Sequence, residues 1–208
     1  MKTAGRKMLE SAAAALKKNN FGCSLHETAA EAAQYLLEMA GTGKQVGLGG
    51  SMTVSEMDLP RRLAEAGNTL ITHTPDMDHE TRIKTWLNAQ AADLYLASPQ
   101  AVTMTGELVL LDGTGNRAAA CIYGPKKVVL IAGVNKLAKD LEQAMSRSRN
   151  VAALANNIRL DRKNPCVKTG KCVDCASPER ICNVSVLFHK KPRHTDLEVV
   201  LVNEELGY

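Results

Sequence analysis

Four of the six cysteines gather near the end of the sequence, in the pattern C-x5-C-x2-C-x6-C. They are Cys166, Cys172, Cys175 and Cys182. The C-x2-C pair lets two sulfur atoms reach one ion from a single turn, and Gly170 and Pro178 supply bends that return the outer cysteines toward it. The pattern therefore predicts a four-thiolate metal site, holding either structural zinc or an iron–sulfur cluster. The alternative is a surface loop with reduced thiols or an opportunistic disulfide.

Basic side chains surround the cysteine pattern. From residue 159 to residue 193 the sequence has nine Lys or Arg residues against three acids. The basic residues are Arg159, Arg162, Lys163, Lys168, Lys171, Arg180, Lys190, Lys191 and Arg193. Four thiolates around a divalent ion leave a net charge of about −2, which nearby cations stabilise. The basic excess therefore suits a metal site, although the same charges would also attract an anionic partner.

A second candidate site is a glycine-rich turn that follows a short predicted strand. Such a turn at the carboxyl end of a parallel strand aligns backbone N–H groups and hydroxyls around an anion. Glu56, one helical turn further on, is the candidate general base, or else a residue that caps the helix. The turn matches neither the Walker A loop nor the dinucleotide-binding motif, so the expected ligand is a small anionic substrate. Simple packing of the strand against the helix is the alternative. The turn residues are Gly49, Gly50, Ser51 and Thr53.

A third segment combines a Thr-Gly-Glu sequence with a second glycine-rich turn. Thr105 and Gly106 belong to the first part, and Asn116 and Arg117 follow the turn at 112–115. The glycines allow close backbone approach, and a guanidinium binds a carboxylate or phosphate with two parallel hydrogen bonds. We expect Arg117 to bind the anionic substrate, although a hairpin turn followed by a helix cap explains the same residues.

Helices and strands that alternate along the chain must position these segments. Apolar residues at helical spacing predict helices, and short β-branched runs predict strands. The predicted helices cover 28–40, 59–66, 78–91, 116–123 and a stretch from a cap at Asn135 to about residue 160. The predicted strands cover 45–48, 69–74, 94–98, two pieces of 102–111, 127–132, 184–189 and 197–202. This order predicts an α/β fold with an open, mainly parallel sheet, flanking helices and two closing strands.

The composition sets the limits of these interpretations. We expect one domain over residues 1–208, with an N-terminal helix and connection at 1–27 and a Cys-rich loop at 164–183. Aromatic residues are only 3% of the chain, which argues against nucleic acid as a partner. The apolar runs are too short for a membrane span or a secretion signal, so we expect a cytoplasmic protein.

Several segments, in this order along the chain, together resemble the LUD (lactate utilisation) domain family. They are residues 49–53 with Glu56, Thr105-Gly106-Glu107, residues 113–117, the stretch 132–136 that contains Asn135 and Lys136, and residues 201–208. The resemblance covers nearly the whole chain. It implies an open α/β sheet of the sugar-phosphate isomerase and CoA-transferase (NagB/RpiA) type. It also implies a role, alongside iron–sulfur partner proteins, in oxidising lactate to pyruvate, and it adds Asn135 and Lys136 to the candidate pocket residues.

The cysteine pattern is a departure from the stand-alone lactate-utilisation C-type protein. Three hypotheses follow. The first is a LUD-domain protein that assists oxidation of lactate or a related 2-hydroxy acid, with the four cysteines holding a cluster for electron transfer. The second is an isomerase or CoA-transferase-like enzyme that uses Glu56 or Glu107 on a small anionic substrate, with a structural zinc. The third is a binding module with a zinc-stapled basic tail.

Overall fold

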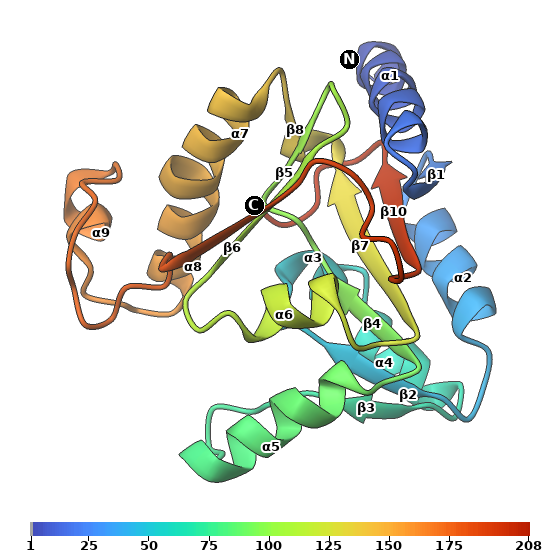
Figure 1. Ribbon diagram of the computed structural model, residues 1–208, viewed down its shortest axis with the longest axis horizontal. Coiled ribbons are helices and arrows are strands. Elements are labelled where there is room, and N and C mark those ends of the chain that lie inside the picture. Colours follow the sequence, from blue (N-terminus) through green and yellow to red (C-terminus); the bar gives the residue numbers. More distant parts are fainter. Residues whose placement is uncertain (1) are drawn as a thin grey trace.

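A six-stranded parallel sheet forms the centre of the computed structural model, which describes residues 2–208 (Figure 1). All neighbouring strands in it run parallel. In spatial order the strands are β1 (Gly22–His26), β10 (Leu197–Val202), β7 (Lys127–Gly133), β4 (Leu94–Ala97), β2 (Gln45–Leu48) and β3 (Thr69–Ile71). The expected α/β class with a mainly parallel sheet is therefore confirmed.

Helices cover both faces of this sheet. Successive side chains of each strand point to opposite faces, and apolar side chains on both faces are buried under helices. Along β7, Val128 and Leu130 pack into one apolar cluster and Val129 and Ile131 into another. The first cluster includes residues of α1 (Lys2–Lys18), α5 (His79–Gln90) and α6 (Asn116–Ile122). The second includes residues of α2 (Ala29–Ala40), α3 (Met52–Glu56) and α4 (Leu59–Glu65). Strands buried on both faces explain the continuous apolar runs in the sequence.

A smaller sheet lies beside the first. Its strands, in spatial order, are β8 (Leu137–Ala138), β5 (Ala101–Thr103), β6 (Leu108–Asp112) and β9 (Val184–Phe188). Helix α7 (Leu141–Arg147) and the π-helical segment η2 (Ser148–Ala153) pack against it, and α8 (Leu154–Arg159) and α9 (Pro165–Thr169) follow them in the chain. Side chains of β5, β6 and β9 also join the first apolar cluster of the large sheet. The two sheets therefore share a core.

Two local expectations were wrong. The connection expected within 1–27 contains strand β1, which pairs with β10 at the edge of the large sheet. The helix expected to begin after Asn135 begins at Leu141, where the Asp140 side chain accepts the Gln143 N–H. Residues 134–136 instead form a short 3-10 turn, η1, that leads into β8. Both expected closing strands are present and lie in different sheets, since β9 pairs with β6 in the small sheet while β10 lies between β1 and β7.

None of the helices in residues 2–208 is long and apolar enough to cross a membrane.

Candidate functional site

A small cavity lies at the carboxyl ends of the neighbouring strands β2, β4 and β7. The chain leaves β2 toward β3 on one side and leaves β4 toward β7 on the other, so the strand order reverses between them. Ligands of open α/β sheets bind at such a point. The polar and charged side chains that line the cavity come from distant segments. They are Ser51, Thr53, Ser98, Gln100, Arg117, Lys136, Asn156 and Tyr208.

Lys136 is the most buried charged group of the cavity, with 3% of its surface exposed. Its Nζ donates to Thr53 Oγ1 at 2.8 Å and to Ser98 Oγ at 2.5 Å. Both partners are neutral hydroxyls. Burial, together with the nearby cations Arg147 and Arg117, lowers the pKa of Lys136 to about 7. Glu56 opposes this shift weakly. Lys136 therefore carries its proton only part of the time at neutral pH.

Arg117 also lines the cavity, but most of its donors are already used. Its guanidinium forms a largely buried ion pair with Asp112, where Nη2 lies 2.7 Å from Oδ1 and Nε donates to the same oxygen at 2.9 Å. Nη2 also donates to Leu111 O at 2.8 Å, whereas Nη1 has only a long contact of 3.5 Å with Ser98 O. Arg117 therefore has Nη1 available for a ligand, rather than the two parallel donors expected from the sequence.

The chain end closes one side of the cavity. Asn135 holds it with two hydrogen bonds, from Nδ2 to Gly207 O at 3.0 Å and from Leu206 N to Oδ1 at 3.1 Å. Glu56 accepts the Gly207 N–H at 2.6 Å. These bonds bring Tyr208 to the cavity wall, where its hydroxyl donates to Asn156 Oδ1 at 3.2 Å. Asn135 and Glu56 thus position the chain end, and neither is a lining residue.

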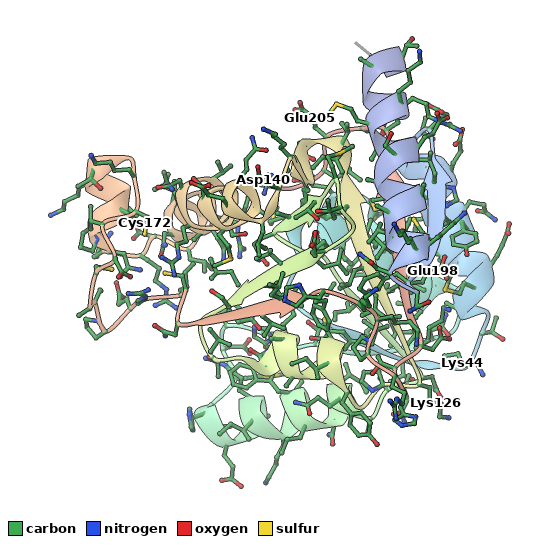
Figure 2. All side chains as sticks on the ribbon, turned by 45° about the horizontal axis from the view of Figure 1, so that its top comes forward. Lys44, Lys126, Asp140, Cys172, Glu198 and Glu205 are labelled. Atoms are coloured by element: carbon green, nitrogen blue, oxygen red, sulfur yellow. The ribbon has the colours of Figure 1, made fainter. Side chains whose placement is uncertain are left out.

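The four cysteines of the C-terminal pattern all line a second cavity. All of them are free, half-buried thiols, and Cys166 Sγ accepts a hydrogen bond from Asn157 Nδ2 at 3.6 Å. Arg180 crosses the loop and donates to the backbone oxygens of Cys175 and, at 3.3 Å, Cys182. Figure 2 shows Cys172 beyond α7 and α8, at the opposite side of the molecule from Glu198 on β10.

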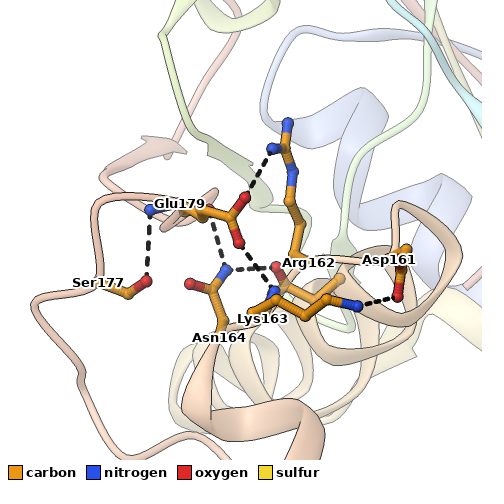
Figure 3. A network of polar contacts seen from close by, with 7 residues as sticks. Asp161, Arg162, Lys163, Asn164, Ser177 and Glu179 are labelled. Carbon is orange, nitrogen blue, oxygen red and sulfur yellow. Dashed lines mark hydrogen bonds and ion pairs between the residues drawn. The ribbon is translucent and has the colours of Figure 1, made fainter.

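A polar network closes the neck of this loop (Figure 3). The Glu179 carboxylate accepts the Lys163 N–H at 2.8 Å and a longer bond of 3.3 Å from Arg162. The buried Asn164 side chain donates to Glu179 O at 2.9 Å and to Asn157 Oδ1 at 2.7 Å. The loop is thus tied at its base to the end of α8, although few backbone hydrogen bonds lie within it.

Comparison with known proteins decides the family. The LUD domain model matches residues 9–202. The chain belongs to the LUD domain family. This family is associated in general with lactate utilisation, as the sequence resemblance indicated. A crystal structure of a DUF162 family protein from Deinococcus radiodurans has a similar fold, with a TM-score of 0.55, 12% identity, and coverage of 95% of this chain and 98% of that chain. No curated protein matches the chain.

The LUD domain brings together only part of the residue set that the sequence suggested. Gly50, Ser51, Thr53, Arg117 and Lys136 line the cavity, and their role in binding stays a prediction. Six others do not line it: Gly49, Glu56, Thr105, Gly106, Asn116 and Asn135.

Several of the residues that do not line the cavity have packing or hydrogen-bonding contacts elsewhere. A Cβ on Gly49 would lie 2.9 Å from Arg117 Cγ, so this glycine lets the arginine cross the turn. Gly106 has φ +85° and packs on α1, where a Cβ would lie 2.6 Å from the Ala15 carbonyl carbon. The neighbouring Thr105 carbonyl accepts from Asn19 Nδ2. Asn116 is the first residue of α6.

Four polar lining residues of the cavity were missed in the sequence: Ser98, Gln100, Asn156 and Tyr208. Ser98 had a usable signal, because it follows strand β4 directly and the carboxyl ends of neighbouring parallel strands meet at one edge. Asn156 had none. Tyr208 lies in the segment 201–208 that carries the family resemblance, but its approach to the cavity depends on how the C-terminal segment returns to the sheet.

The cysteine cavity suits a thiolate-bound metal in composition and charge. Four sulfur donors border it, Arg149 and Arg180 lie beside them, and Arg149 Nε is buried without a hydrogen-bond partner among residues 2–208. In the same described residues, however, no group of three or more His, Cys, Asp or Glu side chains is arranged to hold a metal ion. The loop would therefore have to close around an ion, and the metal site stays a prediction.

The two cavities of this LUD domain share a wall. Ala153, at the end of η2, lines both of them. On either side of it, Asn156 lines the first cavity and Asn157 the second. In the same way Ile181 lines the first cavity and the adjacent Cys182 the second. A ligand in one cavity is therefore separated from the other by single side chains.

Proposed function

We propose that this LUD domain binds a small carboxylate of the 2-hydroxy or 2-oxo acid class in the first cavity, and that it assists oxidation of lactate or a related 2-hydroxy acid. The observation that carries the proposal is the charge of the cavity wall. Lys136 and Arg117 line it, and no Asp or Glu is among its described lining residues. A buried ammonium whose hydrogen-bond partners within the described residues are only hydroxyls gains a charge-assisted hydrogen bond when a carboxylate enters.

The size of the cavity supports a small ligand. Its volume is about 60 Å³. A water-sized group occupies roughly 10–15 Å³ on this measure, so the space suits about four to six small groups. A three-carbon acid has this size, whereas a nucleotide or a CoA thioester is much larger. Glu56 and Glu107, the carboxylates that an isomerase or CoA-transferase reaction would use, bond to the chain end and to threonine hydroxyls instead.

We assign the four cysteines to an iron–sulfur cluster, with zinc as the structural alternative. Cys166, Cys172, Cys175 and Cys182 would hold the cluster, which would supply electron transfer when bound. The wall at Ala153 favours this assignment, because it places the two cavities side by side. Iron–sulfur proteins would be the redox partners, and the cytoplasm is the compartment in which such thiols stay reduced.

Titration calorimetry with L-lactate and with its neutral analogue lactamide tests the carboxylate site. We expect lactate to bind at least about tenfold more tightly than lactamide, because a hydrogen bond to a charged group contributes about 1.5–3 kcal/mol. Lys136→Met, which keeps the length of the side chain, should lose this preference. Lys139→Met, which removes an exposed lysine three residues away, should retain it.

Equal affinity for lactate and lactamide would contradict the carboxylate site. Unchanged lactate binding by a folded Lys136→Met protein would contradict the role of Lys136. The melting temperature of the variant provides the folding control, and we expect it to be unchanged or higher, because the substitution removes a buried amine that has no acidic partner among the residues that the structure describes.

A further inference from the structure

Lys136 has the surroundings of a nucleophilic amine. Its side chain is 3% exposed, yet it lines the cavity at the carboxyl end of the sheet. An ordinary lysine is protonated at neutral pH and its nitrogen has no free lone pair. Here burial and two neighbouring arginines lower the pKa to about 7, so the neutral amine forms a large share of the population. Lysines desolvated beside another cation are known to attack carbonyl carbons.

The two hydroxyls around Nζ are placed to orient it. Thr53 Oγ1 donates to Leu206 O at 3.2 Å, and Ser98 Oγ has a 3.3 Å contact to Pro99 O. With their protons directed to these carbonyls, the hydroxyls present lone pairs to Nζ and accept its N–H groups. An amine that donates two N–H groups to fixed hydroxyls has its remaining direction set, and Lys136 lines the cavity. The same hydroxyls are within reach to relay protons.

We propose that Lys136 forms a reversible imine with the carbonyl carbon of a 2-oxo acid bound in the cavity. The proposal rests on the carboxylate site proposed above. The Nζ lone pair attacks the C2 carbonyl carbon, and a carbon–nitrogen bond forms. The carbonyl oxygen leaves as water with the two hydrogens of the amine, so no oxidant or reductant takes part. Protonation gives a cationic iminium, whose charge is balanced by the carboxylate of the bound acid.

Reductive trapping tests the imine on the full-length protein. We expect pyruvate with sodium cyanoborohydride to add one reduced pyruvate per chain, and peptide mapping to place it on Lys136. Lys136→Met should abolish the adduct, whereas Lys139→Met should not. Lactate has no carbonyl group and should give no adduct. Because the variant alone leaves folding in question, the pH profile of the intact protein gives a second readout, and trapping should slow as the pH falls below about 7.

The outcomes separate this proposal from the carboxylate site. Saturable binding of lactate and pyruvate without a pyruvate adduct on Lys136 would overturn the imine and leave the carboxylate site intact. Trapping on Lys136 without measurable lactate binding would support the imine and contradict lactate as a ligand. Equal labelling of exposed lysines and Lys136 would also overturn the imine, since it would show ordinary surface chemistry.

Discussion

The first cavity and the cysteine loop meet at Ala153, but they are built in different ways. The cavity wall draws Ser51, Ser98, Lys136 and Tyr208 from four distant segments and holds them by buried strand ends and hydrogen bonds. The cysteines instead lie within 17 residues of one loop, which is tied mainly at its neck. Close spacing in sequence brings donors near one another, whereas the sheet edge fixes the orientation of each side chain.

The largest expected effect is the loss of bound metal, which tests the cysteine loop as a metal site. Cys175→Ser should remove all bound metal from protein purified without oxygen, because a cluster or zinc site with four thiolates loses a ligand from its C-x2-C pair. Lactate binding should persist, since Cys175 does not line the first cavity. Iron, sulfide and zinc analysis with a visible spectrum provides the measurement. Cys23→Ser, at a half-buried thiol on β1, is the control and should keep the metal. Full metal content in Cys175→Ser would disprove the ligand assignment.

An intermediate effect concerns pH and the cavity. The folded-state pKa of Lys136 is lowered to about 7 by burial, Arg147 and Arg117, so its ammonium form is present below this pH and is lost above it. Lactate affinity should therefore fall as the pH rises through about 7, by up to about tenfold per pH unit. Pyruvate trapping should change in the opposite direction. Calorimetry at several pH values checks the first trend, and Lys136→Met should show a flat profile. A flat profile in the natural protein would argue against Lys136 as the binding cation.

The smallest expected effect is on lactate affinity alone, and it distinguishes the first cavity from the cysteine loop. Asn135→Ala removes two hydrogen bonds to the chain end, each of which contributes about 0.5–1.5 kcal/mol. Tyr208 would then be held less firmly at the cavity wall, so lactate affinity should fall severalfold while metal content stays the same. Asn88→Ala, on the exposed side of α5, is the matched control. Loss of metal with unchanged lactate affinity would show that the chain end supports the loop rather than the cavity.

Elements with strong local signals were predicted well. Strand β2 matches its expected bounds, and β7 extends its expected range by one residue. Helix α2 ends before Gly41, whose φ of +62° a glycine adopts without strain. Strand β1 was missed because Gly22–His26 lies at a sheet edge and has a mixed burial pattern, without the apolar run of a central strand. Its identity as a strand depends on pairing with β10.

The sequence by itself determined which residue types are available and where most of the helices and strands begin. Apolar spacing, turn glycines and the cysteine pattern act over a few residues, so these are visible without a fold. Only the tertiary structure decided that β9 and β10 belong to different sheets, that Lys136 meets Thr53 and Ser98, and that the Thr105–Gly106 turn packs on α1. These contacts join segments far apart in the chain, and their geometry follows from the pairing of strands and the burial of apolar faces rather than from any local pattern.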